Sequence, residues 1–329
     1  MDTKKIKFSF IIPVKEINGY VRESISKILE IKRDDYEVII YPDEINSEFW
    51  PKTRQIKTGN VGPAQKRSQA IKDALGEILC FIDDDAYPNH DFLAKLDSDF
   101  KETGLVAVGG PAITPVDDNF WQKVSGSIFL SKVAGGFPER YRSVGVKRYI
   151  DDWPSVNLSV RKEAFIKVGG FDCAYWPGED TKFCLDLVEK FKDKILYDPE
   201  LIVWHHRRQG LFKHLKQIGN YGLHRGFFAK KFPRTSFRLK YFLPSFFLAY
   251  VALGIFASLL FSQFIKIYFF GWLVYLSALI FAAWEIYKHE KNILIILNSL
   301  YYIFFTHLIY GLKFIQGFIF VKELQSKLR

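Results

Sequence analysis

Residues 77–85 read EILCFIDDD, in which an apolar run ends in three consecutive aspartates. A short, continuous apolar run is typical of a strand that is buried on both faces of a parallel sheet. Two similar runs come earlier, at 8–14 (FSFIIPV) and 36–42 (YEVIIYP), and segments with helical spacing follow them, at 20–31 and 63–75. This alternation of strands and helices predicts an α/β fold with a doubly wound, mostly parallel sheet.

The region from 110 to 206 is less regular. We expect helices and short strands in it, at 119–133, 161–168, 178–190, 194–197 and 202–206. Neither GxGxxG nor GxxxxGK[ST] is present in the sequence, which excludes the dinucleotide and P-loop fingerprints.

The charge of the chain is concentrated in one short segment. The 329 residues carry a formal net charge of +10, but residues 1–206 hold 29 Lys and Arg against 33 Asp and Glu. Residues 207–240 hold ten basic residues and no acid, and they directly precede a strongly apolar region. Polybasic segments flank membrane spans on the cytoplasmic side, so we expect membrane lipid rather than nucleic acid as the partner of this charge.

Three segments in the C-terminal region are long and apolar enough to span a membrane, at 241–265, 267–284 and 292–312. The third carries Asn298, Ser299 and His307, so it either spans the membrane or lies in the interface, and both alternatives stay open. The basic segment before the first span places the large N-terminal part in the cytoplasm. We therefore expect a multi-pass protein of the cell membrane.

The three aspartates at 83–85 come where an open α/β sheet binds its ligand, after the carboxyl end of a strand. Neighbouring carboxylates repel one another unless a cation neutralises them, and oxygen ligands suit Mg²⁺ or Mn²⁺. The sequence thus favours a divalent cation here. The alternative is a solvated loop in which an aspartate caps the helix after Pro88.

Two further acidic pairs stand at comparable places. Asp43 and Glu44 follow the second strand, where a carboxylate either accepts hydrogen bonds from a base or ribose or forms a turn. Glu179 and Asp180 open a helix, where the helix dipole stabilises acids whatever their function. The functional interpretation of the second pair is a general base that takes the proton of an acceptor hydroxyl.

His205 and His206 end an apolar strand and precede Arg207 and Arg208. One histidine could bind a metal while the arginines neutralise a diphosphate. A purely structural histidine pair is an equally good interpretation of the pattern.

In their order and spacing, six segments resemble the family 2 glycosyltransferases, which have a GT-A fold, here with a membrane-anchored C-terminal region. The segments are FSFIIPVKE at 8–16, YPDE at 41–44, GPAQKRSQAIKDALGEILCFIDDDAYP at 62–88, VNLSVRKEAFIKVGGFD at 156–172, PGEDTKFCLDL at 177–187 and ILYDPELIVWHH at 195–206. The resemblance covers about residues 8–240.

The resemblance implies a domain organisation. A GT-A catalytic domain would occupy residues 1–206, with a nucleotide-sugar half at about 1–110 and an acceptor half at about 111–206. A basic juxtamembrane or interface segment would follow at 207–240, and a membrane region with two or three apolar helices at 241–329.

The resemblance also implies a role for each matching residue. Asp180 would be the catalytic base, with Glu179 and Trp176 contacting the acceptor. Asp83 and Asp85 match the DxD pair, and the metal would be held by Asp85 and His205, for which His206 is a rival. The nucleotide-sugar would be bound by Pro13, Val14, Glu16, Asp43, Lys66, Arg67, Asp83 and Asp84.

These residues together predict an inverting, metal-dependent glycosyltransferase. It would move a sugar from a nucleotide-diphospho-sugar, with a UDP-sugar favoured, to a hydroxyl of a lipid-linked or cell-surface glycan acceptor. The alternatives are a polyprenyl-phosphate glycosyltransferase and a membrane nucleotidyltransferase. Gln217 is followed by Ile-Gly-Asn-Tyr rather than by the QxxRW pattern, which argues against a processive polysaccharide synthase. The donor sugar, the acceptor and the linkage stay open.

Overall fold

The computed structural model describes residues 5–102, 104–175, 177–192 and 194–324. By its internal contacts the chain divides into two units. The sheet unit comprises residues up to 115 together with 142–206, and the helical unit comprises 116–141 together with 207–324.

The sheet unit is built on one sheet of eight strands with the order β3-β2-β1-β4-β9-β6-β10-β8. Their bounds are β1 Phe8–Pro13, β2 Tyr36–Tyr41, β3 Thr53–Gln55, β4 Ile78–Phe81, β6 Ala107–Gly109, β8 Arg148–Ile150, β9 Leu158–Arg161 and β10 Ile195–Tyr197. The strands β3, β2, β1 and β4 pair in parallel, as do β6 and β10. The predicted doubly wound, mostly parallel sheet is confirmed.

One central strand runs against its neighbours. β9 lies between β4 and β6 and pairs antiparallel with both. No strand was expected there: the helix expected at 161–168 takes in the last residue of β9, and residues 158–160 were left unassigned. The edge strand β8, antiparallel to β10, was missed as well.

Helices cover both faces of this sheet, with the bounds α1 Gly19–Leu29, α2 Pro63–Ser68, α3 Ala70–Asp73, α4 Phe92–Asp99, α7 Lys162–Val168 and α8 Glu179–Phe191. Phe10 and Ile12 of β1 belong to the core cluster that contains α1 and α4 side chains, whereas Ile11 belongs to the cluster with α7 and α8 side chains. Successive side chains of a strand point to opposite faces. Because both faces are buried here, β1 is apolar at consecutive positions.

A second, three-stranded sheet has the order β5-β11-β7, with β5 at Ala86–Pro88, β7 at Ala112–Ile113 and β11 at Val203–His205. β11 is antiparallel to β5, so that His205 pairs with Ala86. This pairing brings the end of the 195–206 segment beside the aspartates that follow β4.

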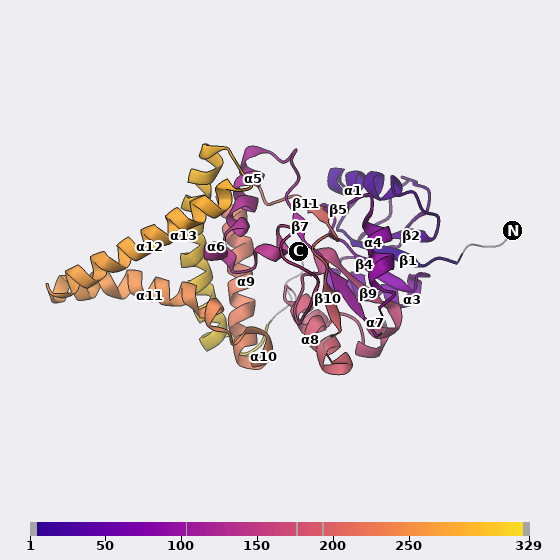
Figure 1. Cartoon of the computed structure of the whole chain (residues 1–329). Coiled ribbons are helices and arrows are strands. Elements are labelled where there is room, and N and C mark those ends of the chain that lie inside the picture. Colours follow the sequence, from indigo (N-terminus) through magenta and orange to yellow (C-terminus); the bar gives the residue numbers. More distant parts are fainter. Residues whose placement is uncertain (1–4, 103, 176, 193, 325–329) are drawn as a thin grey trace. The chain divides into compact units, whose positions relative to one another are not determined.

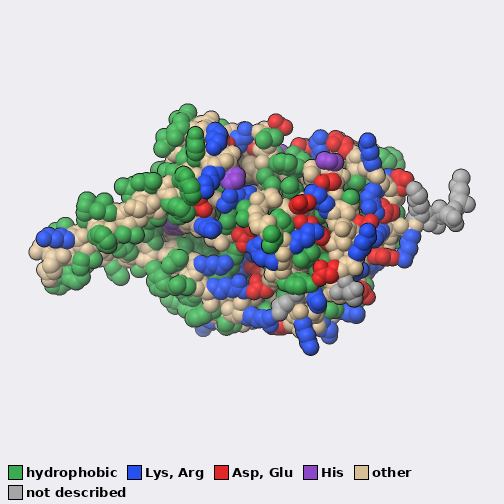
Figure 2. Space-filling view, viewed as in Figure 1, with side chains coloured by type: hydrophobic (Ala, Val, Ile, Leu, Met, Phe, Trp, Pro, Cys, Tyr) green, Lys and Arg blue, Asp and Glu red, His purple; other side chains and the backbone are tan. Residues whose placement is uncertain are grey.

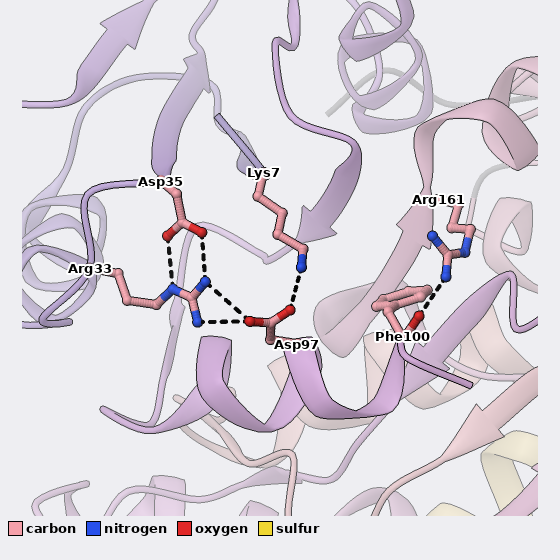
Figure 3. Close-up of polar contacts among 6 residues, drawn as sticks. All are labelled: Lys7, Arg33, Asp35, Asp97, Phe100 and Arg161. Carbon is pink, nitrogen blue, oxygen red and sulfur yellow. Dashed lines mark hydrogen bonds and ion pairs between the residues drawn. The ribbon is translucent and has the colours of Figure 1, made fainter. Parts of the chain in front are cut away.

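An ion-pair network lies at the amino-terminal ends of the strands in the large sheet (Figure 3). Arg33 pairs with Asp35 at 2.6 Å and with Asp97 at 3.2 Å, and Lys7 also bonds to Asp97. Lys7 directly precedes β1, so the network lies at the amino end of that strand. The network fixes the end of α4 there. Residues 83–85 follow β4 and lie beyond the other, carboxyl-terminal ends of the strands.

The helical unit contains the remaining helices: α5 Phe120–Ser127, α6 Lys132–Gly135, α9 Leu211–Lys231, α10 Pro233–Ser236, α11 Leu239–Leu260, α12 Phe264–Tyr287 and α13 Ile293–Ile315. Within this unit α11 and α12 form a hairpin that runs away from α13 and α9 (Figure 1). On the face that Figure 2 shows, hydrophobic side chains lie along the hairpin, and many of them are exposed. Three helices, α11, α12 and α13 with its continuation to Phe320, are long and apolar enough to cross a membrane.

These three helices differ in how much of their apolar surface the protein covers. Within an apolar stretch of 18 residues in each helix, the share of residues that are buried is 6% for α11, 0% for α12 and 39% for α13 with its continuation to Phe320. The backbones of α9 and α13 come very close, because a Cβ atom at Gly226 of α9 would lie only 2.1 Å from the Phe314 carbonyl oxygen. α13 is therefore the packed centre of the helical unit, while α11 and α12 expose their apolar faces.

Residues 116–141 pack with the apolar helices rather than with the sheet. Ser131 Oγ donates a hydrogen bond of 2.8 Å to Glu285 of α12, and the Val133 carbonyl accepts one of 2.9 Å from His307 of α13. From the sequence, this segment was expected to belong to an acceptor half at about 111–206. The division of the chain into catalytic and membrane domains stays a prediction.

Candidate active site

The site is built where the loop after β4 meets the end of β11. Asp83, Asp85 and His205 each offer one ligand atom, and these atoms lie within 4.8 Å of one another. His205 Nε2 lies 3.1 Å from Asp85 Oδ1. Two carboxylate oxygens and an imidazole nitrogen form a donor set that Mn²⁺ or Mg²⁺ accepts, so these residues fit a divalent cation.

The two neighbouring histidines face different surroundings. His206 Nε2 lies 3.0 Å from Glu23 Oε2 of α1, and its ring centre lies 4.7 Å from that of Tyr20. Alternating side chains at the end of β11 explain why only one histidine of the pair can turn toward the aspartates. The sequence left His205 and His206 as rivals, and the structure brings His205 to the acidic cluster.

Arg67 of α2 lies in the interior between two of the predicted site residues. Its Nη1 donates a hydrogen bond of 3.0 Å to Glu179, and its Nη2 pairs with Asp83. Arg67 and Glu179 are 4% and 5% exposed. Burial raises the pKa of Glu179 to about 7, the charge of Asp180 adds to the rise, and Arg67 opposes it. The Glu179 carboxylate is buried against Arg67. Contact of Glu179 with an acceptor stays a prediction.

Asp180 lies in the first turn of α8 and is partly exposed. Its Oδ1 accepts a hydrogen bond of 2.7 Å from the Thr181 amide, and the Thr181 hydroxyl bonds to Asp152 at 3.0 Å. The charge of Asp180 acts on both Arg67 and Glu179, so it lies next to that buried pair. A partly exposed carboxylate is accessible to a substrate, and the role of Asp180 as the base stays a prediction. Trp176, predicted to contact the acceptor, lies outside the described residues.

The residues predicted to bind the nucleotide gather at the ends of β1 and β2. Lys66 is 3% exposed, donates a hydrogen bond of 2.6 Å to the Val14 carbonyl and pairs with Asp43. A pocket is lined there by Pro13, Val14, Lys15, Asp43, Asn60, Val61, Pro63 and Lys66. Glu16 is exposed in the loop after β1 and does not line this pocket.

Sequence reasoning missed one residue near the acids. Asn18 caps α1 by accepting a hydrogen bond of 3.0 Å from the Val21 amide, and its Nδ2 lies 3.4 Å from Asp84. An asparagine before a helical pattern is a recognisable capping signal. Its contact with Asp84 joins positions that are 66 residues apart, and nothing local in the sequence indicates that contact.

Comparison with known proteins assigns the class. Residues 9–168 match the sequence model of the family described as Glycosyl transferase family 2. Together with relatives named as glycosyltransferases, this shows that the chain is a glycosyltransferase with a family 2 domain.

Two relatives are informative. The chain is 23% identical over 242 residues to dolichyl N-acetyl-alpha-D-glucosaminyl phosphate 3-beta-D-2,3-diacetamido-2,3-dideoxy-beta-D-glucuronosyltransferase of Methanococcus voltae, covering 68% of this chain and 74% of the relative. It is 25% identical over 122 residues to poly(ribitol-phosphate) beta-N-acetylglucosaminyltransferase TarS of Staphylococcus aureus, covering 32% of this chain and 21% of TarS.

Among solved structures, the fold is similar to that of the mannosyltransferase PcManGT of Pyrobaculum calidifontis, solved with GDP-Man and Mn²⁺. The TM-score is 0.50 at 16% sequence identity, over 68% of this chain and 63% of that chain. At this identity the likeness supports the GT-A fold alone.

Proposed function

We propose that this protein is an inverting, metal-dependent glycosyltransferase that uses a nucleotide-diphospho-sugar and a lipid-linked acceptor. The observation that carries the proposal is the joint placement of Asp83, Asp85 and His205 on one side and Asp180 on the other, linked through Arg67 and Glu179. Such a site offers both a place for a charged leaving group and a base for an incoming hydroxyl.

The donor would bind with its diphosphate at the acidic cluster. Asp85 and His205, with Asp83 beside them, would hold Mg²⁺ or Mn²⁺, which when bound offsets the negative charge of the diphosphate. Asp43 and Lys66 line the pocket at the ends of β1 and β2, where the base would lie. A UDP-sugar stays the favoured donor, although PcManGT is solved with GDP-Man and the base is a matter for experiment.

Asp180 would act as the general base. Its carboxylate takes the proton of the acceptor hydroxyl as the acceptor oxygen bonds to the anomeric carbon. The bond from that carbon to the phosphate oxygen breaks, and the nucleoside diphosphate leaves with the electron pair. One displacement without a sugar-enzyme intermediate inverts the anomeric configuration.

The names of the relatives support an acceptor hydroxyl close to a phosphate. The Methanococcus voltae enzyme is named for a dolichyl N-acetylglucosaminyl phosphate, and TarS is named for poly(ribitol-phosphate). For this chain we favour the lipid-linked acceptor, because three of its helices are apolar enough to cross a membrane. A role in cell-surface glycan biosynthesis follows from that choice.

The helical unit supports two membrane spans rather than three. α9 runs along α13, from the hydrogen bond of 2.9 Å between His214 and Thr306 to the close contact of Gly226 with Phe314. α9 exposes four lysines, at positions 213, 216, 230 and 231. A lysine costs about 3 kcal/mol at the centre of a bilayer on insertion scales and less near the interface, so these lysines at both ends of α9 favour a place for the helix at the interface.

We therefore favour an arrangement in which α11 and α12 cross the membrane while α13 lies with α9 in the interface. The ten basic residues at 207–240 favour the cytoplasmic side for α9 and for the sheet unit that precedes it in the chain. With two spans, the end of the chain would return to the same side.

A thermal-shift screen of nucleotide-sugars with the full chain, with and without Mn²⁺, tests the donor half of the proposal. One donor should raise the unfolding temperature markedly and only with the metal, because a ligand that binds the native state stabilises it by mass action. Product analysis with that donor should show nucleoside diphosphate. Released pyrophosphate would indicate nucleotidyl transfer and contradict the proposal.

A further inference from the structure

The helix α8, which carries the proposed base in its first turn, begins directly after a glycine. Asp180 lies in that first turn, and the residue at the N-cap is Gly178, which has no side chain that could cap the helix. The first amide groups of a helix have no partner within the helix, so helix ends fray unless other groups hold them. The contacts that hold this turn therefore decide how firmly the Asp180 carboxylate is placed.

Two residues between β8 and β9 are bound to the first two turns of α8. Asp152 Oδ1 accepts a hydrogen bond of 3.0 Å from the Thr181 hydroxyl, 29 residues later in the chain. One turn further along α8, the Trp153 amide donates a hydrogen bond of 3.4 Å to Cys184 Sγ. Positions three residues apart lie on the same face of a helix. Asp152 and Trp153 therefore hold one face of α8 at two successive points.

Trp153 is in turn fixed in the core of the sheet unit. It is buried, and its Nε1 donates a hydrogen bond of 2.9 Å to the Gly110 carbonyl. Its ring centre lies 4.9 Å from that of Tyr197 in β10, and a Cβ atom at Gly109 of β6 would lie only 2.3 Å from the ring. Asp152 is thus tied, through its neighbour in the chain, to two strands of the large sheet.

Thr181 connects this fixed segment to the proposed base. Its hydroxyl donates to Asp152, while its backbone amide donates a hydrogen bond of 2.7 Å to Asp180 Oδ1. Thr181 is 4% exposed and Asp152 is 8% exposed, so water competes little for the bond between them. Hydrogen bonds to an ionised carboxylate are also stronger than those between neutral groups. A buried carboxylate therefore holds Thr181, and Thr181 orients the partly exposed carboxylate of Asp180.

We propose that Asp152 is a positioning residue for glycosyl transfer: it fixes the first turn of α8 through Thr181 and so aims the Asp180 carboxylate at the acceptor hydroxyl. The inference rests on the proposed function for the role of Asp180 as the base. Asp152 acts through Thr181 and contacts neither donor nor acceptor. Misplacing a reacting group by about 1 Å can lower a rate about a hundredfold, so loss of this support should be visible in catalysis.

The change Thr181→Val tests the link with little change of shape, because it removes the hydroxyl and keeps the backbone amide. It should lower kcat at least about tenfold. The KM for the donor should stay the same, because the acids at 83–85 and the nucleotide pocket are untouched. Thr181→Ser, which keeps a hydroxyl, should restore most of the rate. The matched control is Thr53→Val in β3, which removes a hydroxyl bonded to the Pro51 carbonyl at 3.0 Å and should leave kcat unchanged.

A double-mutant cycle with Asp180→Asn separates positioning from general support of the fold. If Thr181 acts by aiming the Asp180 carboxylate, Thr181→Val should cost less than about twofold in rate once that carboxylate has been replaced. A merely structural support would cost the same factor with and without the carboxylate. Asp152→Ala, measured in the same two backgrounds, should follow Thr181→Val.

The experiment uses the full chain in nanodiscs, the donor identified by the thermal-shift screen, and N-acetylglucosaminyl polyprenyl phosphate as the acceptor probe. Release of nucleoside diphosphate is measured over a range of donor concentrations, which separates kcat from KM. The donor thermal shift of each variant shows whether it is folded. If Asp152→Ala does not fold, the cycle of Thr181→Val with Asp180→Asn decides the question.

Equal losses from Thr181→Val in the two backgrounds would overturn the proposal, and so would a normal kcat of Thr181→Val or a Thr181→Ser variant as slow as Thr181→Val. A near-normal rate of Asp180→Asn, or no transfer by the unsubstituted chain, would contradict the proposed function, and the positioning role would fall with it. The two kinds of failure are distinguishable, because the first leaves a working base at Asp180 and the second does not.

Discussion

Arg67 and Glu179 are 112 residues apart in the sequence and are joined by a hydrogen bond of 3.0 Å in the interior of the sheet unit. The second terminal nitrogen of the same guanidinium pairs with Asp83. One buried cation thus connects the start of α8, which carries Asp180, with the loop that carries the acidic cluster. This single side chain thus links the helix that carries the proposed base to the loop that carries the proposed metal site.

Removing this cation should destabilise the fold strongly. Arg67→Met leaves the buried Glu179 without its partner, and breaking a buried ion pair in this way costs about 3–5 kcal/mol. The unfolding temperature in detergent should fall accordingly. Arg67→Met/Glu179→Gln should recover part of the loss, because the second change removes the uncompensated charge.

Lys72→Met, at an exposed position of α3, serves as the control and should shift stability by less than about 0.5 kcal/mol. An Arg67→Met variant as stable as the Lys72→Met variant would show that the buried pair does not hold the site together.

The two neighbouring histidines allow a matched test of the metal site. His205→Ala should weaken Mn²⁺-dependent donor binding at least about tenfold, as loss of a metal-site group ordinarily does. His206→Ala should leave it unchanged, since His206 faces Glu23 and Tyr20. Calorimetric titration of Mn²⁺ in the presence of donor measures both. Asp85→Asn should behave as His205→Ala does, and a larger loss in the His206 variant would reassign the ligand.

A carboxylate outside the site should make stability depend on pH. Burial raises the pKa of Asp99 to about 6, the nearby Asp198 adds to the rise, and Lys147 opposes it. The protonated form is favoured in the folded state, so this stabilisation is fully present below about pH 4 and is lost as the pH rises through 6. Asp99→Asn should remove this dependence, measured as the change in unfolding temperature between pH 4.5 and 7.

Asp97, two residues earlier in α4, should make stability depend on pH in the opposite direction. Burial acts to raise the pKa of Asp97, but Lys7 and Arg33 outweigh burial and hold this pKa below its usual value. Asp97→Asn should therefore cost stability at neutral pH, and the cost should shrink in acid. If both variants showed the same pH trend, the assignment of the Asp99 shift would be wrong.

The number of membrane spans decides on which side the chain ends. With α11 and α12 as the spans, a protease-sensitive tag after Arg329 should be cut from the same side as the sheet unit. The full chain should also resist extraction by high salt, because apolar insertion is not screened. A tag cut only from the opposite side would establish that α13 crosses the membrane as a third span.

The sequence was most informative where burial is two-sided. The strands at 8–14, 36–42 and 77–83 could be predicted because both faces of each are covered, which makes the runs continuously apolar. β9 escaped prediction because its four residues carry a serine and an arginine and continue directly into α7. The packing of 116–141 on α12 and α13 also escaped, since it depends on contacts such as Ser131 with Glu285, 154 residues apart.

The candidate site shows the same contrast. The sequence indicated the acids at 83–85 and at 179–180 because each follows or opens a regular element. It could not separate His205 from His206, because only the pairing of β11 with β5 determines which one turns toward Asp85. Nor could it show that Arg67 is directed to Glu179 and Asp83, since partners of a buried charge are chosen by the fold.

The central claim is that Asp180 deprotonates the acceptor while taking no part in donor binding. The most direct test is the transfer rate of Asp180→Asn with the donor from the screen and a lipid-phosphate-linked sugar acceptor, with donor affinity measured on the same sample. We expect unchanged donor affinity and a transfer rate at least about a hundredfold lower, the usual size of a general-base effect. A near-normal rate would contradict the account and direct the search for the base elsewhere in the site.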